Sequence, residues 1–299
     1  MNAQGKGLEQ HEILKVQLMR GEKEQDYLTH IWNLTSMMDH PIIAKEEDQD
    51  EACYRQFYEE AISLCRQKRF HEVLEKCRYT SLDDEEEYSI DVIQPEKIEF
   101  KQNSYEDGEN SIISFPEFLL LVLDVCTGGE QPASHYQPDK LIEKFDALKT
   151  YFTAGEFYEK MLYYRLLLDY YTIRRDIKDG QGNYSLILKG PKDDSDKLKQ
   201  YQSMLYVSTE AFYNWLKPYL RKLEQDELHS CAEMLAFLKK EDNERHSILP
   251  ARKDLSYKAS GNIRYWFWRL DYYLWEQRST FFNEEEQKIV EHYVFRRNR

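Results

Sequence analysis

The sequence predicts a mainly α-helical fold, and three observations carry this prediction. The 299 residues include only eleven glycines and eight prolines, about half the usual share, so turn-forming residues are too scarce for a β-sandwich or a β-barrel. Apolar residues recur at spacings of three and four along most segments, as on one face of a helix. Hydrophobic residues make up 41% of the chain, which is enough for a buried core. We expect an irregular multi-helix bundle with an acidic insertion and at most one short strand or hairpin.

The periodicity divides the chain into three predicted regions. Residues 1–40 form a helical hairpin whose two helices are separated by Gly21. Residues 41–260 form a central helical domain that contains the acidic insertion at 81–110, which we interpret as an exposed loop. Residues 261–299 form a terminal helix pair. Its first helix carries apolar residues on so many sides that we expect it to be buried nearly all round.

The central domain supplies most of the predicted helices. They cover 50–68, 114–127, 141–152, 156–178, 196–208, 210–223 and 226–240. Ser114 and Glu117 have the spacing of a capping box, which predicts the start of the second of these helices. The segment 184–188 is the best candidate for a strand, because it combines apolar residues with glycines on both sides.

Composition excludes several function classes. The net charge of −14 repels phosphate backbones, so we do not expect the surface as a whole to bind DNA non-specifically. No run of 18 apolar residues occurs, which predicts no membrane contact, and the first residues lack the apolar core of a secretory signal. The five cysteines include no C-x-x-C pair, which favours a cytoplasmic protein with buried single thiols.

A search for catalytic motifs finds none. The sequence has no phosphate-binding glycine loop, no H-x-x-x-H zinc pair and no G-x-S-x-G elbow. A nuclease-like set can be assembled from Asp139, Asp176 and Lys178, but such sites usually lie on a sheet, and both pieces are predicted to lie at helix ends. We therefore predict no catalytic residue, no metal site and no cofactor for this chain. A stand-alone metal-dependent nuclease is the least favoured function.

Six segments carry a resemblance that spans nearly the whole chain. The first, MNAQGKGLEQHEILK at 1–15, is similar to an internal N-x-R-G-x-x-L-x-x-H-E-I-L-K motif, with Gln4 in place of the usual arginine. The others are SFPEFLL at 114–120, KLIEKF at 140–145, YYRLLLD at 163–169 with IRR at 173–175, QSMLYVS at 202–208 and LDYYLW at 270–275. In this order they resemble the GmrSD-type family of bacterial modification-dependent restriction and phage-defence proteins. These proteins have a ParB-like N-terminal domain and a C-terminal HNH-type nuclease.

The resemblance implies the helical middle of a larger restriction protein. Residues 1–40 resemble the end of the ParB-like domain, and 261–299 resemble the segment that leads into the nuclease. The family's D-G-Q-Q-R motif, linked to nucleotide hydrolysis, and its E-H-x-x-P-Q nuclease motif do not occur in this sequence. We therefore expect a non-catalytic scaffold from a truncated or split gene, or a fragment of a longer chain. A nucleoside triphosphate and a divalent metal are implied for the full-length family only.

Candidate contact residues at the start of the chain come from the same resemblance. Asn2 and Gly5 match the opening motif and are expected to contact the nucleotide-bearing domain, as is Lys15. An equally favoured alternative is that Asn2 and Gly5 form the turn that enters the first helix.

Arginines at the end of the chain are the second set of candidates. Arg296, Arg297 and Arg299 are expected to contact a DNA backbone or a neighbouring nuclease domain, and the alternative is a solvated basic tail. The implied partners are the family's N- and C-terminal domains or a complementary protein chain, with DNA bound only in the full-length context. The alternative function is an autonomous protein-interaction or regulatory module, because the apolar segments 8–19 and 266–275 would seek a complement if exposed.

Overall fold

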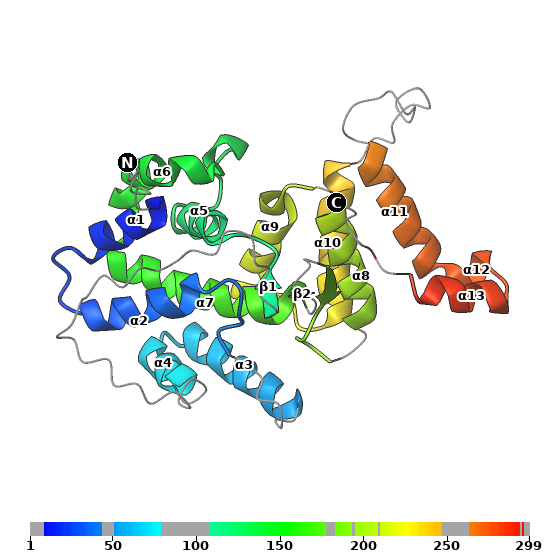
Figure 1. Ribbon diagram of the computed structural model, residues 1–299, viewed down its shortest axis with the longest axis horizontal. Coiled ribbons are helices and arrows are strands. Elements are labelled where there is room, and N and C mark those ends of the chain that lie inside the picture. Colours follow the sequence, from blue (N-terminus) through cyan, green and yellow to red (C-terminus); the bar gives the residue numbers. More distant parts are fainter. Residues whose placement is uncertain are drawn as a thin grey trace, which may run out of the picture.

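The computed structural model describes residues 9–43, 51–78, 108–177, 183–192, 195–208, 210–246, 263–293 and 295. Over these ranges the chain forms thirteen α-helices and one three-stranded antiparallel sheet (Figure 1), which confirms the mainly α-helical class. The sheet has more strands than the single strand or hairpin we expected. No helix in these ranges is long and apolar enough to cross a membrane.

The helices follow one another along the chain with the sheet strands between them. They are α1 (Gln10–Met19), α2 (Gln25–Ser36), α3 (Glu51–Arg66), α4 (Phe70–Arg78), α5 (Phe115–Cys126), α6 (Leu141–Leu148), α7 (Ala154–Tyr171), α8 (Ser195–Val207), α9 (Phe212–Glu224), α10 (Cys231–Arg245), α11 (Ile263–Glu276), α12 (Arg278–Phe281) and α13 (Glu284–Glu291). Short 3-10 turns lie at Ala133–His135, Pro138–Lys140 and Lys149–Tyr151. The strands are β1 (Gly108–Ser111), β2 (Arg174–Ile177) and β3 (Tyr184–Ile187).

Helix α7 is the centre of the core. It packs against α2, α3, α5 and α9, and nearly every side chain from Phe157 to Tyr170 is buried. In Figure 1, α2 lies below α7 and α5 lies above it. A capping box fixes its start, where the Glu156 amide donates to Thr153 Oγ1 at 3.2 Å and the Thr153 amide donates to the Glu156 carboxylate at 2.7 Å.

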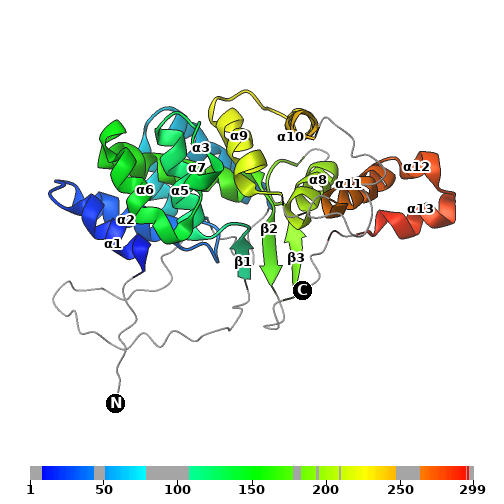
Figure 2. The ribbon, with the colours of Figure 1, turned by 90° about the horizontal axis from the view of Figure 1, so that it is seen from above.

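The predicted end of this helix was wrong. We expected it to run to residue 178, but α7 ends at Tyr171, and the chain is extended from Thr172 into β2. Strand β2 lies in the middle of the sheet (Figure 2). Its Arg174 lies opposite Ser111 of β1, and its Ile177 lies opposite Tyr184 of β3. Pairing on both sides outweighs the local helical pattern of these residues.

The predicted acidic loop at 81–110 was wrong at its C-terminal end, where strand β1 begins. Its residues 108–110 are the start of the strand, and 81–107 lie outside the described residues. The predicted strand at 184–188 is confirmed as β3. Gly190 follows β3 at a close crossing, where an added Cβ would lie 1.9 Å from the backbone oxygen of Tyr170.

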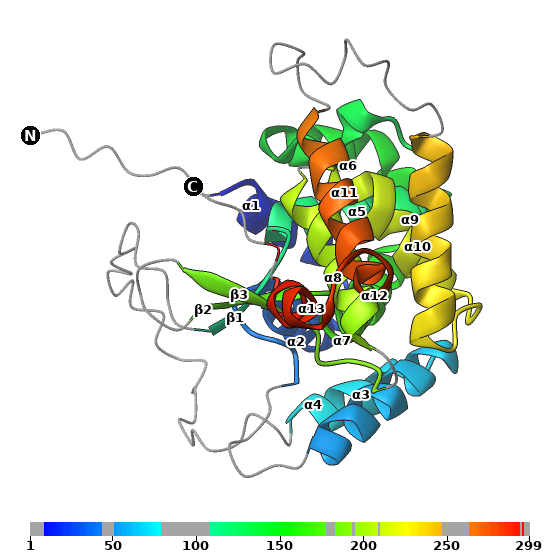
Figure 3. The same cartoon turned by 90° about the vertical axis from the view of Figure 1, so that its right-hand side faces the viewer.

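The paired helices α3 and α4 lie side by side below the core in Figure 3. We predicted the first but not the second. Helix α4 nevertheless has a regular apolar pattern, because Phe70, Val73, Leu74 and Cys77 are all buried. The predicted capping box of α5 is confirmed, and the Ser114 amide donates to the Glu117 carboxylate at 2.7 Å.

Helix α11 is not buried all round, as we had expected. Tyr265, Tyr272 and Trp275 are buried, whereas Phe267 is 56% exposed and Tyr273 is 50% exposed. The reason is that α8 and α10 cover α11 on one side only, and α11 to α13 project from the helical body (Figures 1 and 2). The neighbouring helices therefore cover only some of the aromatic side chains of α11, and the others are exposed.

Candidate functional site

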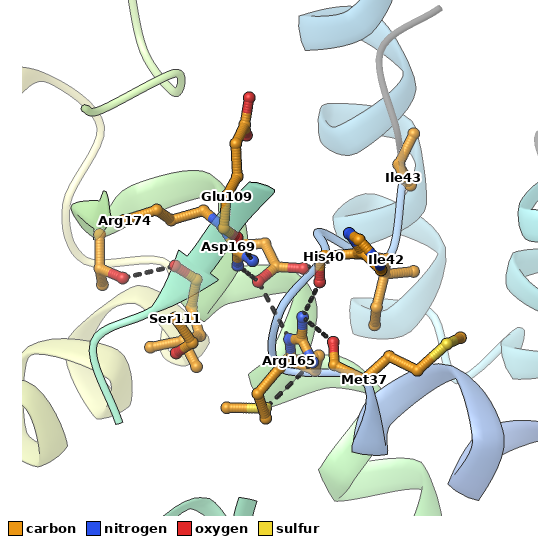
Figure 4. A network of polar contacts seen from close by, with 12 residues as sticks. Met37, His40, Ile42, Ile43, Glu109, Ser111, Arg165, Asp169 and Arg174 are labelled. Carbon is orange, nitrogen blue, oxygen red and sulfur yellow. Dashed lines mark hydrogen bonds and ion pairs between the residues drawn. The ribbon is translucent and has the colours of Figure 1, made fainter. Parts of the chain in front are cut away.

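A buried network of charges lies on one side of α7 (Figure 4). Arg165 and Asp169 stand one helical turn apart with fully buried side chains, and Arg165 Nε donates to Asp169 Oδ1 at 3.0 Å. Arg174, the first residue of β2, pairs with the same carboxylate oxygen. Two guanidinium groups therefore share one carboxylate, and all three side chains are buried.

The rest of this network is made with backbone groups. Arg165 donates to the carbonyl oxygens of Thr35 at 2.9 Å and Met37 at 3.0 Å, both at the end of α2. Asp169 Oδ2 accepts from the Ile42 amide at 2.7 Å, and Arg174 Nε donates to the Glu109 carbonyl on β1 at 2.8 Å. These hydrogen bonds join the end of the helical hairpin, α7 and the sheet. It presents no reactive group to a substrate.

Electrostatics agree with a structural role for this network. Burial lowers the pKa of the Arg165 guanidinium, and the adjacent Asp169 carboxylate opposes that effect. The network holds two cations and one anion, and backbone carbonyl oxygens accept the remaining guanidinium hydrogen bonds. Removing the one carboxylate would leave buried charge without a counter-ion, which is strongly destabilising.

Two other buried carboxylates also connect helices. Asp242 on α10 accepts from Tyr201 on α8 and from Tyr265 on α11, both at 2.7 Å. Asp124 on α5 pairs with Lys217 on α9 at 2.9 Å. Desolvation raises the pKa of Tyr201 and of Tyr265 well above the usual range, so both hydroxyls stay protonated and donate to Asp242.

A cavity of about 700 Å³ opens between five parts of the chain: the end of α3 with the turn to α4, the end of α5, residues 151–152 before α7, the first half of α7 and the end of α9. Apolar side chains from different elements form much of its wall: Cys65, Phe70, Val125, Cys126 and Phe152. Such a cavity is of the size that holds a small organic molecule.

Most charges of the cavity are paired across it. Arg66 on α3 contacts Asp226 after α9 at 2.9 Å, and Lys160 on α7 pairs with Glu224 at the end of α9. Arg66 Nε also donates to the Tyr163 hydroxyl at 3.2 Å. These contacts hold α3, α7 and α9 together around the opening.

Three charged residues of the cavity, Lys68, Glu156 and Glu159, have no ion-pair partner within 4.0 Å among the residues that the structure describes, and Glu156 accepts hydrogen bonds from Thr153. Glu159 is half-buried, and desolvation raises the pKa of its carboxyl, with His71 and Lys68 opposing that effect at longer range. Lys68 and His71 therefore partly compensate the charge of Glu159 without forming an ion pair with it.

Lys68 and Asp226 share an unusual backbone conformation. Their φ angles are 60° and 58°, and they are the non-glycine residues with positive φ in the described part of the chain. Each follows the end of a helix in a Schellman motif. The amide of Arg69 donates to the Leu64 carbonyl at 2.9 Å, and the amide of Glu227 donates to the Lys222 carbonyl at 3.1 Å. Glycine is the usual residue at this position, so these side chains are kept at some conformational cost.

The residues predicted as family contacts are only partly described. Asn2, Gly5, Arg296, Arg297 and Arg299 lie outside the described residues. Lys15 lies on α1, where its ammonium donates to Asn33 Oδ1 on α2 at 2.9 Å, and burial lowers its pKa. Lys15 thus stabilises the hairpin, and its contact with a nucleotide-bearing domain stays a prediction.

The nuclease-like set requires one correction. Asp176 lies on β2 of the sheet, opposite Ser185, and not at a helix end as we expected. Asp139 lies in the 3-10 turn Pro138–Lys140, and Lys178 is outside the described residues. Within the described ranges, no group of three or more His, Cys, Asp or Glu side chains is placed to hold a metal ion.

The sequence analysis did not find either the buried network or the cavity. The spacing of Arg165 and Asp169 by four residues was a visible signal for an ion pair. The signal for the cavity was weaker. Lys68 and Asp226 occupy the positions after α3 and α9 where glycine usually ends a helix.

No family model, curated protein or solved structure matches this chain. The resemblance to the GmrSD-type family therefore depends on the ordered segments described above.

Proposed function

We propose that this chain is a non-catalytic helical scaffold of a GmrSD-like modification-dependent restriction protein. In this proposal it connects a nucleotide-hydrolysing domain at one end to a nuclease domain at the other. The observation that supports the proposal most is the buried Arg165–Asp169–Arg174 network, which joins the hairpin α1–α2 to α7 and to the sheet. A connector that transmits a rearrangement must move as one body, and a satisfied buried polar network provides that rigidity.

The proposal is tested in bacteria that carry this gene with its flanking reading frames. We expect those frames to encode the D-G-Q-Q-R and E-H-x-x-P-Q motifs, and restriction of phage with modified DNA to require this chain together with both domains. Deleting this chain should abolish restriction while both domains remain soluble. Restriction that persists without this chain, or flanking frames without either motif, would contradict the proposal.

A second candidate function is an autonomous protein-interaction module. It is favoured by the exposed apolar side chains of the projecting helices α11 to α13: Phe267, Leu270, Tyr273, Phe281 and Ile289. An exposed group of this kind often marks an interaction surface. Light scattering should then show association of the purified chain with itself or with the products of adjacent genes. A monodisperse monomer that binds none of these products would argue against this function.

A further inference from the structure

We propose that the projecting arm formed by α11, α12 and α13 docks on the same arm of a second copy of this chain, with the two arms antiparallel about a two-fold axis. This proposal rests on the second candidate function above and deepens it, because it names the partner. Four features of the arm support it: a ridge of exposed side chains, the area of that ridge, a small cavity in the arm and the charges at its two ends.

The ridge runs along the exposed side of α11. Four exposed side chains follow one another there at a spacing of three residues: Arg264, Phe267, Leu270 and Tyr273. This spacing aligns side chains in one row on the surface of a helix, and such rows pack into the grooves of another helix. The ring centroids of Tyr273 and Phe281 lie 5.6 Å apart, so the ridge continues onto α12.

The apolar area of the ridge matches that of a protein interface. Its four apolar side chains are each about half exposed: Phe267, Leu270, Tyr273 and Phe281. A large apolar side chain presents about 150–250 Å² when it is uncovered, so the four together present roughly 400 Å². A standard interface takes about 800 Å² from each partner, and a little over half of that area is apolar. The ridge therefore supplies most of the apolar surface that one side of such an interface needs.

A small cavity in the same arm can receive a side chain from the partner. Its volume is about 140 Å³, and its wall includes Leu274 of α11, Phe282 after α12 and Val290 of α13. An apolar cavity of about 150 Å³ holds one benzene ring, and the ridge presents such rings. The arm thus carries both protruding and hollow parts. An interface between two copies related by a two-fold axis requires this self-complementarity.

The charges at the two ends of the arm favour an antiparallel pair. Arg264 at the start of the ridge has no ion-pair partner within the described ranges. Three exposed acids, Glu284, Glu285 and Glu286, begin α13 just after Phe281. Figure 1 shows the start of α11 at one end of the arm and α12 with α13 at the other. A two-fold axis across the ridge brings the arginine of each copy toward the acids of the other, whereas a parallel pair would place like charges together.

The test is analytical ultracentrifugation of the full chain over a range of concentrations. We expect a reversible change from one chain to two, with a dissociation constant on the order of micromolar. Leu270→Arg, in the middle of the ridge, should weaken association at least about tenfold. Val16→Arg is the matched control, because Val16 is 69% exposed on α1, outside the arm, and this change should leave association as it is. Both variants should keep the melting temperature of the wild type, because both sites are on the surface.

Charge reversal tests the antiparallel orientation. At low salt, Arg264→Glu should weaken association about two- to fivefold, and so should the double change Glu284→Lys with Glu285→Lys. The chain with all three changes should regain the affinity of the wild type, because opposite charges then face each other again.

A wild type that stays a single chain would overturn the proposal. So would unchanged association of Leu270→Arg, or no recovery in the chain with all three charge reversals. A single chain that binds a product of an adjacent gene would overturn only the choice of partner and leave the interaction function in place. A single chain that binds none of these products would overturn both.

Discussion

Replacing Asp169 by asparagine tests the role of the buried network most sharply. The change keeps the shape of the side chain and removes its negative charge. Arg165 and Arg174, with side-chain exposures of 0% and 3%, would remain as two cations without a counter-ion. Removing one partner of a buried ion pair costs about 3–5 kcal/mol. This is a large part of the roughly 5–15 kcal/mol by which a typical protein is stable.

The assay is urea unfolding at pH 7 followed by circular dichroism. Asp146→Asn is the matched control, because Asp146 is 47% exposed and pairs with Lys149 on the surface. We expect the control to change the free energy of unfolding by no more than about 0.5 kcal/mol. The Asp169→Asn chain should lose at least about 3 kcal/mol or fail to fold. A loss below about 1 kcal/mol would refute the inference that this carboxylate joins the hairpin to the core.

Three other features give predictions of their own. At Gly190 an added Cβ would lie 1.9 Å from a backbone oxygen, so Gly190→Ala should cost about 1–3 kcal/mol, whereas Gly155→Ala, with nothing within 4 Å, should be neutral or stabilising in urea unfolding. In the native protein, a thiol reagent should modify the exposed Cys53 rapidly and should modify Cys77 only after unfolding, because burial raises the pKa of Cys77 to about 12. Equal modification rates of the two thiols in the native protein would contradict this. The raised pKa of Glu159 means that the folded chain binds this proton more tightly than the unfolded chain does. Its contribution to stability is therefore present below the unfolded pKa and is lost as the pH rises through the folded value, so Glu159→Gln should flatten the pH dependence of unfolding above about pH 4. An unchanged slope in this variant would contradict the assignment.

Local pattern was sufficient for the helices that carry their own signals. Ser114 and Glu117 form the capping box that their spacing predicts, and the apolar periodicity of α2, α5 and α9 places them within a few residues. Strand β3 was also predicted, because its flanking glycines and apolar residues are close together in the sequence.

Long-range partners decided what the local pattern could not. The residues from Thr172 to Ile177 continue a helical pattern, and they form a strand because β1, about 65 residues earlier in the chain, pairs with them. The face of α11 that is buried depends on the position of α8, so its aromatic residues alone did not determine their exposure. Within the candidate site, Arg165 and Asp169 were visible as a pair, but the carbonyl oxygens that complete the network belong to a segment about 130 residues away.

We propose that the chain is a non-catalytic scaffold, in which the charged groups of the described residues hold its parts together. The most direct measurement is incubation of the purified chain with Mg²⁺ or Mn²⁺, GTP and plasmid DNA, followed by gel analysis and phosphate release. We predict neither cleavage nor hydrolysis above the buffer control. Metal-dependent cleavage that is lost in the Asp176→Ala variant would contradict the claim.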